Sequence, residues 1–113
     1  LDFALNRLKN ILKNMNVYPK KMLKNLNITN GLIFSQRVML ELTRHGFSRE
    51  KAYTLVQKNA QNSWKKNISF FNSLANDSLI NKKISNKDLI KMFDLNYHTR
   101  RINFIYKRIF KKT

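Results

Sequence analysis

The chain contains no cysteine, only one proline and two glycines, and only six acidic residues against 23 basic ones. Without cysteine it can form no disulfide, no thiolate metal site and no cysteine nucleophile. The scarcity of glycine and proline leaves few of the turn clusters that separate β-strands. No apolar run approaches the roughly 20 residues that cross a bilayer, and the first residues lack the layout of a secretory signal. The composition therefore predicts an all-α protein with no membrane partner, and we expect it in the cytoplasm.

The groups that carry most catalytic chemistry are also scarce. No two carboxylates have a spacing that suggests a general acid and a general base. The two histidines, His45 and His98, lie far apart in the sequence, and a zinc site needs three or four ligands. Gly31 and Gly46 stand alone, so there is no glycine-rich phosphate loop. The residues predict no metal site, no glycine-rich phosphate site and no complete active site.

The length of the chain sets a further limit. Its 113 residues allow one modest core but are few for an enzyme that encloses its own substrate. The first residue is Leu1 rather than a methionine, and we therefore expect a fragment of a longer polypeptide.

Apolar residues recur at helical spacing along most of the chain. Residues 1–15 carry a stripe at i, i+3, i+4 and i+7, and such a stripe needs a partner to cover it. Pro19 suits the first turn of a short second helix, and Asn30 with Gly31 forms a turn that tolerates positive φ. Further helices are predicted over ranges that share the same periodicity: 31–46, 48–64, 69–74, 85–93 and 102–110. The sequence thus predicts about six helices and no strand.

Local signals mark the ends of these helices. Gly46 suits a left-handed C-terminal cap, and Ser48 suits the N-cap of the helix that follows. Ser69 and Ser85 are further candidate N-caps, the second of them within a variant of the capping box. Trp64 is predicted to be a core anchor near the end of its helix, with stacking on a ligand as the alternative.

Ser35 and Gln36 interrupt an otherwise apolar run. On a helical wheel they project into the apolar arc of the helix that begins near Gly31, opposite Arg37 and Glu41. Burying a hydroxyl or an amide without a partner costs about 1–3 kcal/mol, so we expect both side chains to be hydrogen-bonded. They either tie this helix to neighbouring backbone or face a polar cavity.

The net charge of +17 has two interpretations. Lysine and asparagine are abundant in every segment, which is typical of compositional drift across a proteome. Alternatively, the charge serves to bind a polyanion, because clustered Lys and Arg release counterions from phosphates. The alternative function is then a stand-alone basic helical protein that binds RNA, DNA or a ribonucleoprotein assembly. Its candidate contacts are the cations of the last segment: Arg100, Arg101, Lys107, Arg108, Lys111 and Lys112.

Three runs of sequence are more specific than these patterns: NMNVYPKKMLKNLNITNGLIFSQRVMLEL, HGFSREKAYTLVQKNAQNSW and MFDLNYHTRRINFIYKRIF. They contain the linked blocks N-x-x-V-Y-P, G-L-I-F-S-Q-R-V, S-R-E-x-A-Y-x-x-V-Q and F-D-x-x-Y-H. Together they resemble the C-terminal region of the adenylosuccinate lyase family, in the fumarase and aspartase superfamily, in register over essentially the whole chain. Family members usually carry more acidic residues where this chain has Lys65, Lys66, Lys107 and Arg108, so the polyanion alternative stays open.

The resemblance implies an activity. The family cleaves adenylosuccinate to AMP and fumarate, and it removes fumarate from the succinylated carboxamide ribotide of purine biosynthesis. It does so by β-elimination, without a metal or organic cofactor, in a homotetramer whose long helices form a shared bundle. The family's serine-bearing mobile loop and its catalytic histidine segments have no match in this sequence. No catalytic or substrate-binding residue is therefore carried over.

The resemblance also implies an organisation. Residues 1–30 would end the central helical bundle and add a connecting short helix, and residues 31–113 would form the C-terminal helical domain. The partner of this segment would be the remainder of the lyase polypeptide. Six positions match the family's structural motif: Gly31, Ser35, Gln36, Arg37, Gly46 and Ser48. Among them, Ser35 and Gln36 are expected to fix how the C-terminal domain docks on the end of the bundle.

Overall fold

A computed structural model describes residues 1–110 of the chain. The helices, in chain order, are α1 (Asp2–Lys13), α2 (Pro19–Asn27), the short 3-10 helix η1 (Leu32–Phe34), α3 (Ser35–Arg44), α4 (Arg49–Lys66), α5 (Phe70–Ala75), α6 (Ser78–Asn81), α7 (Asn86–Met92), α8 (Asn96–Thr99) and α9 (Ile102–Ile109). The described residues contain no strand, so the all-α prediction is confirmed. The sequence predicted fewer helices because α6 and α8 are single turns, which are too short to display a period of 3.6 residues.

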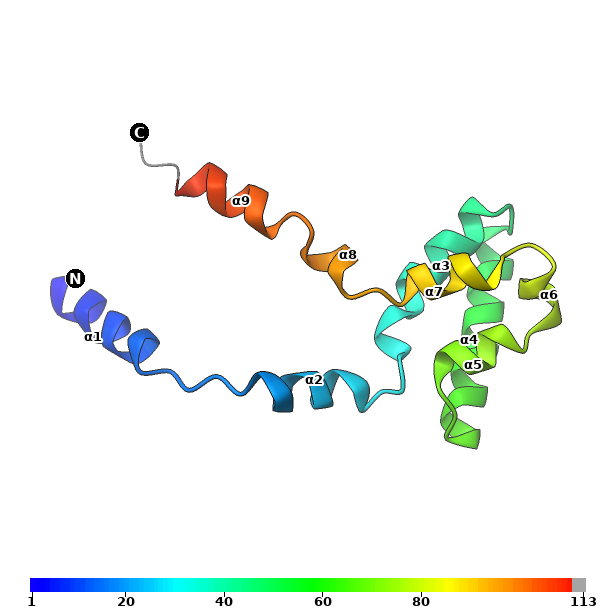
Figure 1. Cartoon of the computed structure of the whole chain (residues 1–113), viewed down its shortest axis with the longest axis horizontal. Helices are drawn as coiled ribbons and strands as arrows, with labels where there is room; N and C mark the ends of the chain where they lie inside the picture. Colours follow the sequence, from blue (N-terminus) through cyan, green and yellow to red (C-terminus); the bar gives the residue numbers. More distant parts are fainter. Residues whose placement is uncertain (111–113) are drawn as a thin grey trace.

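The molecule consists of a body and two arms (Figure 1). The body comprises η1 and α3 to α7. The N-terminal arm, α1 and α2, and the C-terminal arm, α8 and α9, leave the same side of the body and diverge (Figure 1). The extents of 59 × 35 × 24 Å reflect this elongated shape.

One hydrophobic core holds the body together. It lies where α3 packs on α4, α4 on α5, and α7 on both α3 and α5. Its buried side chains are Val38, Leu42, Ala52, Leu55, Val56, Phe70, Leu74, Ile80, Ile84, Leu89 and Met92. Burying each of the larger ones contributes roughly 1.5–3 kcal/mol relative to exposure, so this core is the main source of the body's stability.

The predicted helix ends are confirmed. The hydroxyl oxygens of Ser48, Ser69 and Ser85 each accept a hydrogen bond from the backbone N–H three residues later. Gly46 has a φ of +84° just after α3, in the left-handed region that glycine adopts without strain. Asn30 and Gly31 also have positive φ, at +50° and +90°. These short-range signals could be read from the sequence because each depends only on neighbouring residues.

The prediction for Trp64 is wrong, because its side chain is 76% exposed. Successive steps of four residues advance 400° around a helix, so Trp64 lies about 120° away from Ala52. The buried face of α4 instead runs from Ala52 through Leu55 to Asn59 and Ser63, which are 2% and 1% exposed. The core of α4 is therefore partly polar.

The prediction for Ser35 and Gln36 also differs from the structure. The core face of this helix is set by Val38 and Leu42, with Phe34 just before it, and Gln36 lies about 160° away from Val38 around the axis. Gln36 is accordingly exposed and Ser35 half-buried. Within residues 1–110 neither side chain forms a hydrogen bond, so they do not tie α3 to neighbouring backbone of this segment.

Candidate functional site

Both arms carry apolar faces that the described part of the chain leaves uncovered. None of α1, α2 and α9 contains a buried residue. The exposed apolar side chains of α1 include Leu5, Leu8, Ile11 and Leu12, and those of α9 include Ile102, Ile105, Tyr106 and Ile109. Contiguous exposed apolar surface of this kind marks an interaction site. The arms are therefore surfaces for packing against other protein.

Arg37 of α3 contacts α8 and the residues just before it in two ways. Its Nη1 donates a hydrogen bond to the backbone oxygen of Asp94 at 3.0 Å, and its guanidinium carbon lies 3.8 Å from the centre of the Tyr97 ring. Arg100 approaches the same ring at 4.1 Å. A guanidinium group is attracted to the electron-rich face of an aromatic ring. Tyr97 thus gathers two cations at the joint between the body and the C-terminal arm.

A pocket of about 380 Å³ opens beside this pair. Its polar lining includes Gln36, Arg44 and His98, and its apolar lining includes Ile33 and Leu40. Ile33 and Leu40 remain 42% and 49% exposed. We call these five residues, together with Arg37, Glu41 and Tyr97, the joint pocket. Its mixture of charged groups, an aromatic ring and aliphatic groups is typical of the centre of a protein interface.

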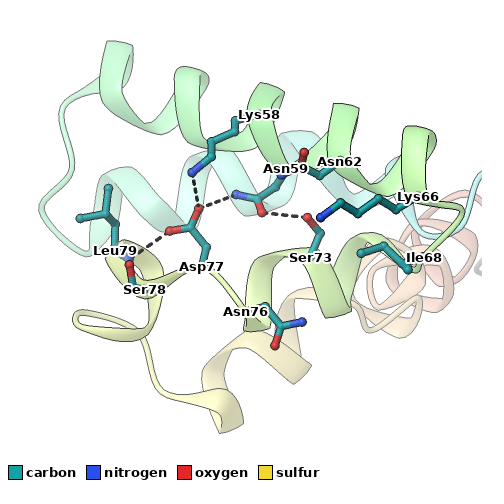
Figure 2. Close-up of a pocket in the computed structure, with 10 residues that line it drawn as sticks. All are labelled: Lys58, Asn59, Asn62, Lys66, Ile68, Ser73, Asn76, Asp77, Ser78 and Leu79. Carbon is teal, nitrogen blue, oxygen red and sulfur yellow. Dashed lines mark hydrogen bonds and ion pairs between the residues drawn. The ribbon is translucent and has the colours of Figure 1, made fainter.

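A second pocket, of about 330 Å³, lies where α4 faces α5 and the segment around Asp77 (Figure 2). Four of its side chains, which we call the Asn59 cluster, are linked by polar contacts: Lys58, Asn59, Ser73 and Asp77. Nδ2 of Asn59 donates to Leu55 O at 2.9 Å and to Oδ2 of Asp77 at 3.0 Å. The Ser73 hydroxyl donates to Oδ1 of Asn59 at 2.8 Å.

Asp77 is the buried charged residue of the Asn59 cluster. Its carboxylate is 5% exposed, accepts the backbone N–H of Leu79 at 3.0 Å, and lies 3.6 Å from Nζ of Lys58. Burial alone would raise the pKa of Asp77, but the hydrogen bonds from Asn59 and Leu79, with the nearby Lys58 charge, together lower it below the usual value. The carboxylate is therefore ionised and fully paired, so its role is to hold α4 and α6 together.

The two histidines do not converge on one site. Nδ1 of His45 lies 2.8 Å from the backbone oxygen of Glu41, at the C-terminal end of α3. His98 lies in α8, with its ring 6.3 Å from that of Phe34 and 5.5 Å from that of Tyr97. Within residues 1–110, no group of three potential metal ligands lies close together. No helix of this range is long and apolar enough to cross a membrane.

The six predicted motif residues lie at several places along η1, α3 and the turn that follows α3. Gln36 and Arg37 share the joint pocket, whereas Gly46 and Ser48 form the turn at the opposite end of α3. Gly31 precedes η1, where an added Cβ would lie 3.2 Å from Cε1 of Phe93. The structure therefore does not assemble these residues into one site.

Four of the six cations of the alternative nucleic-acid interface lie in the described part of the chain, around α8 and α9. Arg100 stacks on Tyr97, Arg101 precedes α9, and Lys107 and Arg108 lie in its last turn. Lys111 and Lys112 lie outside the described residues. Within the described chain both the apolar residues of α9 and its cations are exposed.

Two sets of residues in these pockets were missed. Asn59 and Ser73 are ordinary polar residues in the sequence. Asn59 follows the buried Leu55 by four residues on α4, and this helical spacing could have placed it on the buried face. The contact of Arg37 with Tyr97 joins residues that are remote in the chain, and nothing local predicts it.

Comparison with known proteins shows which proteins this chain resembles. Residues 31–109 match the family model described as the adenylosuccinate lyase C-terminus. The chain is similar to adenylosuccinate lyase of Helicobacter pylori (45% identity, 97% of this chain, 27% of the relative). It is also similar to that of Bacillus subtilis (38%, covering 96% and 25%) and that of Thermotoga maritima (36%, covering 91% and 24%). The chain thus spans about a quarter of the length of these curated relatives, and they lend the nucleic-acid alternative no support.

Proposed function

The chain belongs to the adenylosuccinate lyase family, and we propose that it forms the C-terminal part of a lyase that cleaves adenylosuccinate to AMP and fumarate. The same enzyme would release fumarate from the succinylated carboxamide ribotide of purine biosynthesis. Both reactions are β-eliminations, in which a base removes a proton from carbon and an acid protonates the departing nitrogen. The relatives' shared name and their match along nearly the whole chain support this assignment.

The observation that carries the proposal is the uncovered surface of the arms. Helices α1, α2 and α9 bury no residue within the described chain, although each has an apolar face. Isolated amphipathic helices of this length are marginal in water, so their stability must come from packing. The relatives are about four times as long as this chain, because the chain covers 27% and 25% of their length. The remainder of such a lyase polypeptide would supply the missing contacts.

Within that enzyme the segment would act as scaffold and in domain closure rather than in proton transfer. Asp77 is buried and paired, and the two histidines lie in different surroundings, which supports this structural role. The catalytic acid and base would therefore come from the rest of the polypeptide, with no cofactor. We further propose a homotetramer in the cytoplasm.

The proposed domain boundary lies at residue 30. Residues 1–30 would close the central bundle and connect to residues 31–113, the C-terminal domain. Two observations support this position: the family model begins to match at residue 31, and the chain turns at Asn30 and Gly31 with positive φ.

A segment exchange tests the proposed function. The last quarter of the Helicobacter pylori relative is replaced by this chain, and fumarate release from adenylosuccinate is followed by absorbance. We expect the exchanged enzyme to be active, because similar segments present similar docking faces. The same exchange with the Bacillus subtilis segment shows whether the enzyme tolerates a foreign segment at this junction. The Helicobacter pylori relative without its last quarter shows whether activity requires a C-terminal segment at all.

One pattern of results would contradict the proposal. If the Bacillus exchange is active while the exchange with this chain is soluble but releases no fumarate, the segment does not serve this lyase. Binding of RNA by the full chain, with a salt dependence that reflects several neutralised phosphates, would then favour the nucleic-acid alternative.

A further inference from the structure

Two cations of the joint pocket region have no acidic partner in the described chain. Glu41 pairs with Arg44 at 2.6 Å, and Asp88 pairs with Lys91 at 2.9 Å. The carboxylate of Asp94 accepts the backbone N–H of Asn96. Within residues 1–110, Arg37 and Arg100 have no ion pair and share the ring of Tyr97 instead. Glu41, which lines the joint pocket, is therefore paired with Arg44, and no carboxylate of residues 1–110 forms an ion pair with Arg37 or Arg100.

Arg37 also carries an unsatisfied donor. Its Nε is buried and has no hydrogen-bond partner within the described residues, although Nη1 donates to the backbone oxygen of Asp94. A buried donor without an acceptor costs about 1–3 kcal/mol. Because Nε is enclosed by the chain's own atoms, an external group pairs with the rest of the guanidinium, where a carboxylate forms a charge-assisted hydrogen bond.

The surroundings indicate that this partner belongs to a protein surface. Ile33 and Leu40 expose aliphatic groups at the pocket. The pocket is lined by residues of η1, α3 and α8, and both arms, whose apolar faces are uncovered, join the body near these elements (Figure 1). A protein that covers the arms therefore reaches Arg37 as well, and the +17 charge of the chain favours an acidic surface there.

We propose that the joint pocket is a docking site for an acidic side chain from the lyase polypeptide outside residues 1–113, in the same or a neighbouring subunit. The carboxylate pairs with Arg37 while aliphatic groups beside it cover Ile33 and Leu40. The pairing fixes the angle between the body and the C-terminal arm. Arg37 belongs to the body, and it already contacts Asp94, just before α8, and Tyr97 within α8. This inference rests on the proposed function, since it requires the rest of the enzyme.

Carbodiimide cross-linking of the intact enzyme tests the proposal directly. The variant Arg37→Lys keeps the positive charge and introduces an amine that a carbodiimide joins to a carboxylate in contact with it. We expect mass spectrometry to find a new link between the peptide containing position 37 and an acidic residue outside residues 1–113. Arg49→Lys is the matched control, because Arg49 is exposed and forms no ion pair within the described residues. This control should give no such link.

The identified acid then allows a charge-exchange experiment. Arg37→Glu and the reverse change at the acid should each lower the melting temperature of the intact enzyme, and the double change should restore most of the loss. A link only to Glu41 or Asp94, or no link at all, would overturn the proposal. So would stabilisation of the wild-type enzyme by free phosphate or succinate that Arg37→Gln abolishes, because the pocket would then bind a small anion.

The two proposals can fail separately. An exchanged enzyme that releases fumarate but gives no external cross-link refutes the docking site and leaves the lyase assignment intact. An enzyme that gives the cross-link but does not act on adenylosuccinate refutes the assigned reaction and leaves the docking site.

Discussion

Replacing Asn59 by alanine should destabilise the body more than any other single polar truncation in α4. Asn59 is 2% exposed and is the residue through which the Asn59 cluster is connected. Its amide donates to Leu55 O and to the Asp77 carboxylate, and its carbonyl accepts the Ser73 hydroxyl. Asn59→Ala removes all three bonds at once and leaves a buried carboxylate and a buried hydroxyl each short of a partner.

The size of the effect follows from those unpaired groups. An unsatisfied buried group costs about 1–3 kcal/mol, and more for a charged one. In the variant Lys58 still lies beside the Asp77 carboxylate, and the backbone N–H of Leu79 still donates to it. These two contacts limit the destabilisation that comes from Asp77. We therefore expect Asn59→Ala to lower the free energy of unfolding by about 2–4 kcal/mol, a large fraction of the 5–15 kcal/mol typical of a domain.

Urea unfolding followed by circular dichroism at a helical wavelength provides the assay. Trp64 fluorescence is unsuitable because its side chain is 76% exposed and reports little on the core. Asn62→Ala is the matched control, since Asn62 lies on the same helix, is only half-buried and makes no side-chain hydrogen bond within residues 1–110. It should cost less than about 0.5 kcal/mol. Equal losses in the two variants would refute the reasoning.

Two further predictions concern pH and docking. The pKa of Asp77 is lowered in the folded chain, so its contribution to stability is complete above the unfolded pKa of roughly 3.9 and is lost as pH falls through the lower folded value. The stability difference between wild type and Asp77→Asn, measured by urea unfolding, should therefore shrink below about pH 4, and a difference that grew on acidification would contradict this. Gln36→Leu in the intact enzyme should shift the melting temperature more than turnover, because Gln36 lines the joint pocket; an unchanged melt with lost turnover would assign it to catalysis instead.

The sequence predicted what depends on near neighbours. The N-caps at Ser48, Ser69 and Ser85 and the turns at Asn30, Gly31 and Gly46 are each decided within a few residues, and all six are confirmed. Amphipathic periodicity likewise located the longer helices. These signals suffice for the class of fold and for most helix ends.

The predictions that were wrong concern which face of a helix is buried. Trp64 was assigned to the core on size and four-residue spacing, but the rotation of that spacing carries it to the surface and brings Asn59 inside. Gln36 was placed on the apolar arc because the arc was drawn from all nearby apolar residues, including Leu40, which is 49% exposed. The true core face follows Val38 and Leu42 only. An arc drawn through every apolar residue of α3 therefore does not coincide with its core face.

The joint pocket could not have been predicted from sequence patterns. The hydrogen bond of Arg37 to Asp94 and its stacking on Tyr97 connect α3 to a segment that follows four intervening helices. Such contacts depend on how the whole body packs. The quoted motif blocks do contain both residues, but a motif gives no indication that its members meet in space.

The central claim is that this chain is the C-terminal part of an adenylosuccinate lyase, and reading the natural coding sequence upstream of the codon for Leu1 tests it most directly. The account predicts a frame that continues upstream into the serine-rich mobile loop and the histidine segments of the family. A start codon immediately before Leu1 would contradict it, because the catalytic part of the enzyme would then be absent and binding of a polyanion by this chain of net charge +17 would become the leading explanation of function.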